Sequence, residues 1–158
     1  KKLSGHKWDK IISSPLNRAI ETARIIGAHV GIEEPEIMDS LIERSYGEAA
    51  GLLPAERRER FPNGIPGQEE FEALRERGER SIETIAARYM GCNVIVVSHG
   101  GLINSILYTV SGGEIGSFKT RLFNSSINLL ERDENGWSLI FHNLTASDEI
   151  LENYFDYK

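Results

Sequence analysis

The sequence predicts an α/β fold: a three-layer sandwich with helices on both faces of a mostly parallel sheet and an antiparallel hairpin at one edge. Two observations lead to this class. Short apolar runs alternate with segments of helical periodicity, and the run at residues 94–97 is Val-Ile-Val-Val, which is typical of a strand buried on both faces. Near the end of the chain, Asn135-Gly136 lies between two β-rich segments and is typical of a hairpin turn.

The first half of the chain is expected to hold a strand, a helix and a long loop. Residues 10–13 are a short apolar run, and Ser14-Pro15 then predicts a helix with Ser14 as its N-cap and proline in its first turn. The apolar face of that helix repeats at helical spacing through Leu16, Ala19, Ile20, Ala23, Ile26 and Gly27. A brief strand at 36–38 leads into a loop over 39–67, which glycines and prolines break and one short helix at 54–60 interrupts.

The second half predicts two helices and the hairpin. An amphipathic helix covers 68–89, with Gly78 on its apolar face where another backbone comes close. After the strand at 94–97, Gly100-Gly101 turns the chain into a second helix. Segments 126–132 and 137–143 are the expected hairpin strands, and the tail 149–158 is expected to pack loosely or fray.

Composition limits the partners and the number of domains. The 158 residues, 40% of them hydrophobic, fit one domain with its own core. A net charge of -6 argues against nucleic acid and against an anionic membrane as partners, and no apolar run approaches the length of a membrane span. Cys92 is the only cysteine, which excludes an internal disulfide and favours a reducing cytoplasm. The oligomeric state stays open.

His99 is the first candidate for chemistry. It directly follows the strand at 94–97 and its Ser98, so it is expected at the carboxyl end of that strand, beside the start of the next helix. Gly100 and Gly101 would let a ligand approach the backbone there. A histidine that only caps an ordinary strand-to-helix turn fits the local pattern equally well.

Arg18 and Glu43 are the other two candidates. Arg18 falls in the first turn of a helix, where a cation is unfavourable by about 0.3 to 1 kcal/mol and a bound phosphate would reverse that effect. A surface arginine paired with Glu21 is the alternative. Glu43 lies in a glycine-rich loop and could donate a proton to a leaving alkoxide, although Glu33 and Glu48 look equally suitable in isolation.

Three segments in order resemble a known pattern. Residues 13–19, Ser-Ser-Pro-Leu-Asn-Arg-Ala, followed by Thr-Ala at 22–23, resemble SSPLxRAxxTA. Residues 43–51 resemble ERxYGxxxG, and residues 96–101, Val-Val-Ser-His-Gly-Gly, resemble VSHGG. These elements are those of the histidine phosphatase (phosphoglycerate-mutase-like) superfamily, and the resemblance spans nearly the whole chain.

The resemblance implies a phosphomonoester hydrolase that acts through a phosphohistidine on small phosphorylated metabolites. It makes His99 the second histidine of the site, Arg18 the phosphate-clamping arginine and Glu43 the general acid, with a backbone N–H from Gly100 on the phosphate. No metal or other cofactor is implied. The short interval between Glu43 and His99 favours a phosphatase over a phosphoglycerate mutase, and a catalytically inactive phosphate-binding or regulatory homologue is a further alternative.

One element of the pattern is absent from the sequence. The family forms its phosphohistidine on an Arg-His-Gly triplet at the end of a first strand, and His6, His29 and His142 lie in none of the motifs. The chain also begins with residues that read like the end of a helix. Residues 1–158 are therefore expected to be a domain incomplete at its N-terminus, with a vacant or otherwise filled slot beside the strands that end at Ser13 and Ser98. Direct pairing of those strands would contradict that idea.

Overall fold

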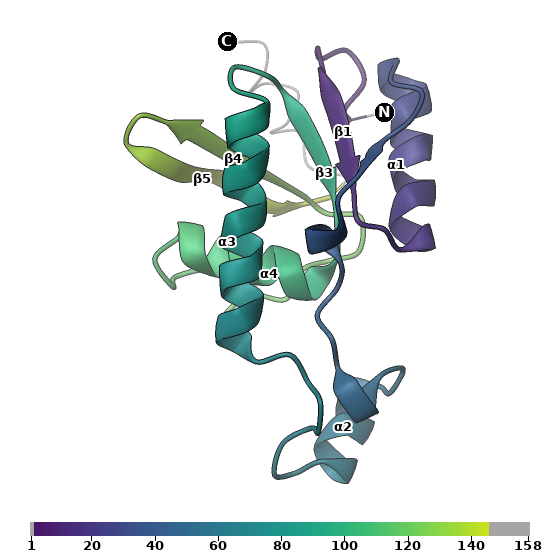
Figure 1. The fold of residues 1–158 in the computed structure, drawn as a ribbon, viewed down its shortest axis with the longest axis vertical. Coiled ribbons are helices and arrows are strands. Elements are labelled where there is room, and N and C mark those ends of the chain that lie inside the picture. The colour runs from purple at the N-terminus through teal and green to yellow at the C-terminus, as the bar shows by residue number, and fades with distance from the viewer. Residues whose placement is uncertain (1, 146–158) are drawn as a thin grey trace.

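The computed structural model describes residues 2–145 of the chain (Figure 1). A three-stranded parallel sheet in the order β2-β1-β3 and a two-stranded antiparallel sheet, β4-β5, are combined with four α-helices and two short 3-10 helices. The elements, in chain order, are β1 (Lys10–Ser13), α1 (Asn17–Val30), β2 (Glu36–Ile37), η1 (Asp39–Leu41), η2 (Gly47–Ala49), α2 (Pro54–Arg60), α3 (Phe71–Arg88), β3 (Val94–Val97), α4 (Gly100–Val110), β4 (Ile127–Asp133) and β5 (Gly136–Leu144).

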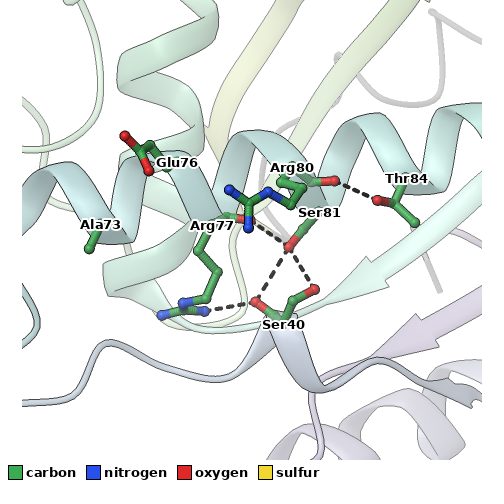
Figure 2. A pocket seen from close by; sticks show the side chains of 7 residues that line it. All are labelled: Ser40, Ala73, Glu76, Arg77, Arg80, Ser81 and Thr84. Atoms are coloured by element: carbon green, nitrogen blue, oxygen red, sulfur yellow. Dashed lines mark hydrogen bonds between the residues drawn. The ribbon is translucent and has the colours of Figure 1, made fainter.

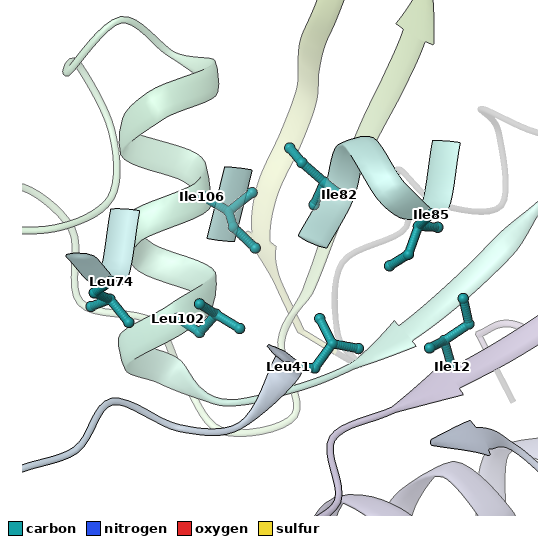
Figure 3. Packing of buried hydrophobic residues seen from close by; sticks show 7 residues of the cluster. All are labelled: Ile12, Leu41, Leu74, Ile82, Ile85, Leu102 and Ile106. Atoms are coloured by element: carbon teal, nitrogen blue, oxygen red, sulfur yellow. The ribbon is translucent and has the colours of Figure 1, made fainter. Parts of the chain in front are cut away.

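Neighbouring residues of β1 pack against different helical layers. Ile11 packs with Ala23 and Ile95 on the side that α1 covers. Ile12 faces the other way, because successive side chains of a strand alternate between its faces. It joins a cluster with η1, α3 and α4 that consists of Leu41, Leu74, Ile82, Ile85, Leu102 and Ile106 (Figure 3). The predicted α/β class, with helices on both faces of a parallel sheet, is confirmed.

The strands β1 and β3 are directly hydrogen-bonded to each other. They pair in parallel from Lys10↔Val94 to Ser13↔Val97, and the N–H of Ser14 continues the ladder to the carbonyl of Val97 over 2.9 Å. The prediction of a strand slot between them is therefore wrong. The motifs predict where each strand lies in the chain but contain no signal for the order in which strands pair. Within the described residues, β3 pairs with β1 alone, and Val96 is 39% exposed rather than buried.

The predicted hairpin forms, but as a sheet of its own instead of an edge of the parallel sheet. Its turn is held by Asp133, whose carboxylate accepts N–H bonds from Asn135 and Gly136 over 2.8 and 3.1 Å. Leu130 and Trp137 pack against the cluster that contains Ile12. The hairpin is therefore anchored by side chains on the layer of α3 and α4, and not by backbone pairing with β3.

Three other details differ from expectation. The N-cap of α1 is Leu16, so this helix begins two residues later than Pro15. Gly78 lies close to side chains of α4 and not to a backbone, since an added Cβ would be 2.9 Å from Ile106 Cγ1 and 3.1 Å from Ser105 Oγ. The tail at 149–158 lies outside the described residues. Among residues 2–145, no helix combines the length and apolar character needed to cross a membrane.

Candidate active site

The site is built on the carboxyl ends of β1 and β3. Because Ser13 is level with Val97, the residues that follow the two strands meet at the same edge of the sheet. Ser14 Oγ lies 2.7 Å from His99 Nε2. Both side chains are buried, with Ser14 at 0% and His99 at 7% exposure. Ser14, which the sequence indicates as a helix cap, in fact binds the candidate histidine, although its hydroxyl also accepts the N–H of Leu16 over 3.3 Å.

Arg18 reaches this histidine from the first turn of α1. That turn contains no acidic residue, so the positive end of the helix and the guanidinium face the site together. Arg18 Nε donates to His99 Nδ1 over 3.3 Å. No ion pair between Arg18 and Glu21 is seen within residues 2–145, where the ion pair of α1 is that of Arg24 with Glu34. Among residues 2–145, no partner is seen on the terminal nitrogens of Arg18, so they can bind an anion.

The contacts of His99 indicate which of its ring nitrogens carries the proton. Nδ1 accepts a hydrogen bond from Arg18, so the neutral ring carries its proton on Nε2 and donates it to Ser14. Burial lowers the pKa of His99 below its ordinary value of 6.5; the carboxylate of Glu43 raises it and the guanidinium of Arg18 lowers it further. These contacts favour the neutral ring.

The side chain of Glu43 lies against the start of α4, beside Gly101, which is two residues past His99. Its Oε1 accepts hydrogen bonds from the N–H of Gly101 over 3.1 Å and from that of Arg44 over 2.8 Å. Gly101 permits this approach, because a Cβ there would lie 2.5 Å from Oε1. Gly101 therefore admits a side chain of this protein where the sequence predicted a ligand. At Gly100, the first residue of α4, an added Cβ would meet open space.

A cavity of about 610 Å³ lies beside these groups. Its size is within the range of about 300 to 1,000 Å³ that is usual for small-molecule sites. Arg18 and Glu43 both line it, and the Arg18 guanidinium connects it to His99. The structure therefore brings the predicted residues Arg18, Glu43, His99 and Gly100 to one edge of the sheet. The remaining lining residues are Leu16, Ile42, Arg44, Ser45, Tyr46, Gly47, Ala50, Gly51, Glu69 and Arg77.

Two lining residues, Glu69 and Arg77, were not predicted from the sequence. Their side chains form an ion pair of 2.8 Å and are only 18% and 21% exposed. They lie eight residues apart near the start of α3. In the sequence, they cannot be told apart from the other charged residues of this helix. Their partners are 24 to 37 residues away in the chain, which no local pattern indicates.

A second cavity, of about 420 Å³, lies on the other side of Arg77. Figure 2 shows Arg77 and Ser81 of α3 pointing toward Ser40. The cavity is lined by Ser40, Ala73, Glu76, Arg77, Arg80, Ser81 and Thr84. Within residues 2–145, no group of three His, Cys, Asp or Glu side chains is placed to hold a metal ion.

Comparison with known proteins gives one family. Residues 1–145 match the model of the histidine phosphatase superfamily, branch 1. The chain is 35% identical over 140 residues to the uncharacterized phosphatase PhoE of Bacillus subtilis, which covers 88% of this chain and 72% of that protein. It is 31% identical over 164 residues to a metal-independent phosphoserine phosphatase of Arabidopsis thaliana, which covers 92% of this chain and 67% of that protein.

Solved structures give the same fold. YhfR of Bacillus stearothermophilus superposes with a TM-score of 0.80 at 20% identity, over 92% of this chain and 78% of that one. The phosphoserine phosphatase of Entamoeba histolytica, in complex with 3-phosphoglyceric acid, superposes with a TM-score of 0.69 at 20% identity. That match covers 89% of this chain and 76% of the other.

Proposed function

The chain belongs to the histidine phosphatase superfamily, and from this premise we propose that the whole protein hydrolyses small phosphomonoesters through a phosphohistidine intermediate. Its curated relatives include proteins named as phosphatases. The observation that carries the proposal is the hydrogen bond from Arg18 Nε to His99 Nδ1 at the edge of a cavity that Glu43 also lines. A transferring phosphoryl group needs donors on its equatorial oxygens and an acid at the leaving oxygen, and these residues offer both.

Arg18 is assigned to the phosphoryl group. Its Nε is used by His99, which leaves the two terminal nitrogens to form a fork on two phosphate oxygens. The N–H of Gly100, at the positive end of α4, is assigned to another oxygen. His99 is assigned to the same group as the second histidine, to which it can donate from Nδ1 once the ring has taken up a second proton. Its buried bond to Ser14 fixes the direction in which Nδ1 points.

Glu43 is assigned to the leaving group. Its Oε1 is occupied by two backbone N–H groups, so the proton that it donates is carried by Oε2. In the first step, the phosphorus–oxygen ester bond breaks, the phosphoryl group bonds to a histidine nitrogen, and the departing oxygen takes the proton of Glu43. In the second step, water attacks the phosphorus and gives a proton to the Glu43 carboxylate, the phosphorus–nitrogen bond breaks, and inorganic phosphate and the free histidine are released.

The proposal requires a nucleophilic histidine, which the family carries on an Arg-His-Gly triplet that residues 1–158 do not contain. His99 has both ring nitrogens engaged, by Arg18 and by Ser14, which suits a binding role better than nucleophilic attack. The substrate class, small phosphorylated metabolites, is supported by structures of the same fold in which Entamoeba histolytica phosphoserine phosphatase is bound to phosphoserine or to 3-phosphoglyceric acid.

The test uses the full-length protein in the presence of a metal chelator. We expect release of inorganic phosphate from phosphoserine, 3-phosphoglycerate and 4-nitrophenyl phosphate, and an acid-labile phosphoprotein after a rapid quench. Arg18→Ala should lower kcat/KM by about 10³-fold, because a clamping arginine stabilises transition-state charge. Arg24→Ala is the matched control, since this arginine of α1 is exposed and paired with Glu34.

Three outcomes would contradict the proposal. Interconversion of phosphoglycerates with negligible phosphate release would make the protein a mutase. Tight phosphate binding without turnover would make it an inactive regulatory homologue. A stable phosphohistidine at His99 would reverse the roles assigned to the two histidines.

A further inference from the structure

Glu43 belongs to the segment 40–45, which is hydrogen-bonded to the start of α3 both before and after this residue. On one side, Arg77 Nη1 donates to the carbonyls of Ser40 and Ile42 over 2.7 and 2.8 Å. On the other side, the carbonyl of Glu69 accepts two hydrogen bonds from the Arg44 guanidinium over 3.0 and 2.8 Å. The residues before and after the candidate acid are therefore attached to the same helix start.

The two anchors are joined into one unit. Arg77 Nε and Nη2 form a fork on the two carboxylate oxygens of Glu69, at 2.9 and 2.8 Å. The same carboxylate accepts the N–H of Ser45 over 3.2 Å, and the N–H of Glu69 donates to the carbonyl of Ser45 over 2.9 Å. Bidentate arginine–carboxylate pairs are directional, so this pair fixes the geometry of the segment as well as its distance from α3.

The charged state of Glu69 agrees with this role. Burial raises the pKa of its carboxyl, but the hydrogen bond and the charge of Arg77, the N–H of Ser45 and the charge of Arg44 together lower it below the ordinary value. The side of α3 beyond Arg77 also supports the segment, since Ser81 Oγ lies 2.8 Å from Ser40 Oγ (Figure 2).

We propose that Arg77 and Glu69 are positioning residues that hold the Glu43 carboxyl at the leaving-group oxygen. This inference rests on the proposed function. Neither side chain needs to contact the phosphoryl group, because both act through the backbone of residues 40–45. Losing either anchor would let Glu43 move away from the N–H of Gly101, while Arg18, His99 and Ser14 would keep the contacts that the sheet gives them.

Two substrates separate this role from a general structural one. Release of an alkoxide from phosphoserine needs a positioned proton donor, whereas 4-nitrophenolate leaves as a stable anion without one. A misplaced acid therefore lowers turnover of the alkyl ester selectively. A loss of folding, or of phosphate binding, lowers turnover of both substrates together.

The experiment measures kcat/KM of the full-length protein on both substrates for Arg77→Ala and Glu69→Gln. We expect each variant to lose about 10²-fold on phosphoserine and to change by less than about threefold on 4-nitrophenyl phosphate. Arg75→Ala and Glu72→Gln are the matched controls, since these neighbours on α3 form an exposed pair with each other. Both controls should retain the ratio of the wild-type protein.

A double variant tests whether the anchors act through Glu43. In a Glu43→Gln background, adding Arg77→Ala should leave the phosphoserine rate unchanged within about twofold, because no acid remains to be positioned. Equal losses on both substrates, or additive losses in the double variant, would overturn the inference. If Arg77→Ala does not fold, Glu69→Gln still decides, since it keeps the size of the side chain. A wild-type protein that hydrolyses neither substrate would instead overturn the proposed function.

Discussion

The two halves of the candidate site are positioned by different means. The phosphoryl half is built around Ser14 and His99, which follow paired strands and are almost fully buried. The leaving-group half consists of Glu43, which stands on a segment held by side-chain contacts with Arg77 and Glu69. The first half depends on the packed core. The second depends on one largely buried ion pair, so the position of Glu43 can be altered while Ser14 and His99 stay in place.

His99→Ala is expected to cause the largest loss of activity, because it affects the half that the core fixes. Removing this buried contact to the phosphoryl group should lower kcat/KM by about 10³-fold on alkyl and aryl esters alike. His29→Ala is the control, since that histidine lies exposed on α1, where its Nδ1 is 2.8 Å from the carbonyl of Ile25 in the preceding turn. A loss confined to alkyl esters would assign His99 to the leaving-group half.

Gly101→Ala is expected to affect the contact between α4, which follows His99, and the carboxyl of Glu43. Its Cβ would lie 2.5 Å from Glu43 Oε1, so the carboxyl must move away from α4. We expect a loss of about 10²-fold on alkyl esters, with a much smaller effect on 4-nitrophenyl phosphate. Gly100→Ala adds the same methyl group to open space and keeps its backbone N–H, so it should lose far less. Equal losses in the two variants would contradict this explanation.

Ser14→Ala should have a smaller effect, because it changes the orientation of His99 without removing it. The loss of the acceptor on Nε2 should lower kcat/KM by about tenfold and shift the proton between the ring nitrogens, which nitrogen NMR of the histidine ring can detect. Ser13→Ala is the matched control, since Ser13 is equally buried and its hydroxyl donates to the carbonyl of Ser14. An unchanged NMR spectrum for Ser14→Ala would contradict the bond.

The pH dependence of stability should show the smallest effect. The pKa of His99 is lower in the folded protein than its ordinary value of 6.5, so the unfolded chain binds more protons between the two values. The free energy of unfolding should therefore rise with pH between the folded pKa and 6.5. Below and above this window, His99 should add no further pH dependence. His99→Gln should remove that part of the slope in urea unfolding at a series of pH values. A slope unchanged by the substitution would contradict the lowered pKa.

Features with a local signal could be predicted from the sequence. The strands at 10–13 and 94–97 and the helix at 54–60 occupy the predicted residues, because apolar runs, proline and glycine act within a few positions. The placement of Arg18 in the first turn of α1 was predictable for the same reason.

Features that depend on distant contacts could not be predicted. The direct pairing of β1 with β3 joins residues more than 80 positions apart, and the separation of the hairpin from the parallel sheet has no local signature. Ser14 has the sequence context of a helix cap, and only the register of two strands places it against His99. Arg77 and Glu69 look like surface charges until residues 40–45 fold against them.

Evolution can change the length of this chain at some positions and not at others. One residue inserted between Ile12 and Ser13 would move Ser13 out of level with Val97 and turn Ser14 away from His99. Around α2, which Figure 1 shows lying apart from the sheet, an insertion leaves that register untouched. Related genes should therefore vary in length near α2 and keep a constant spacing from β1 to Arg18.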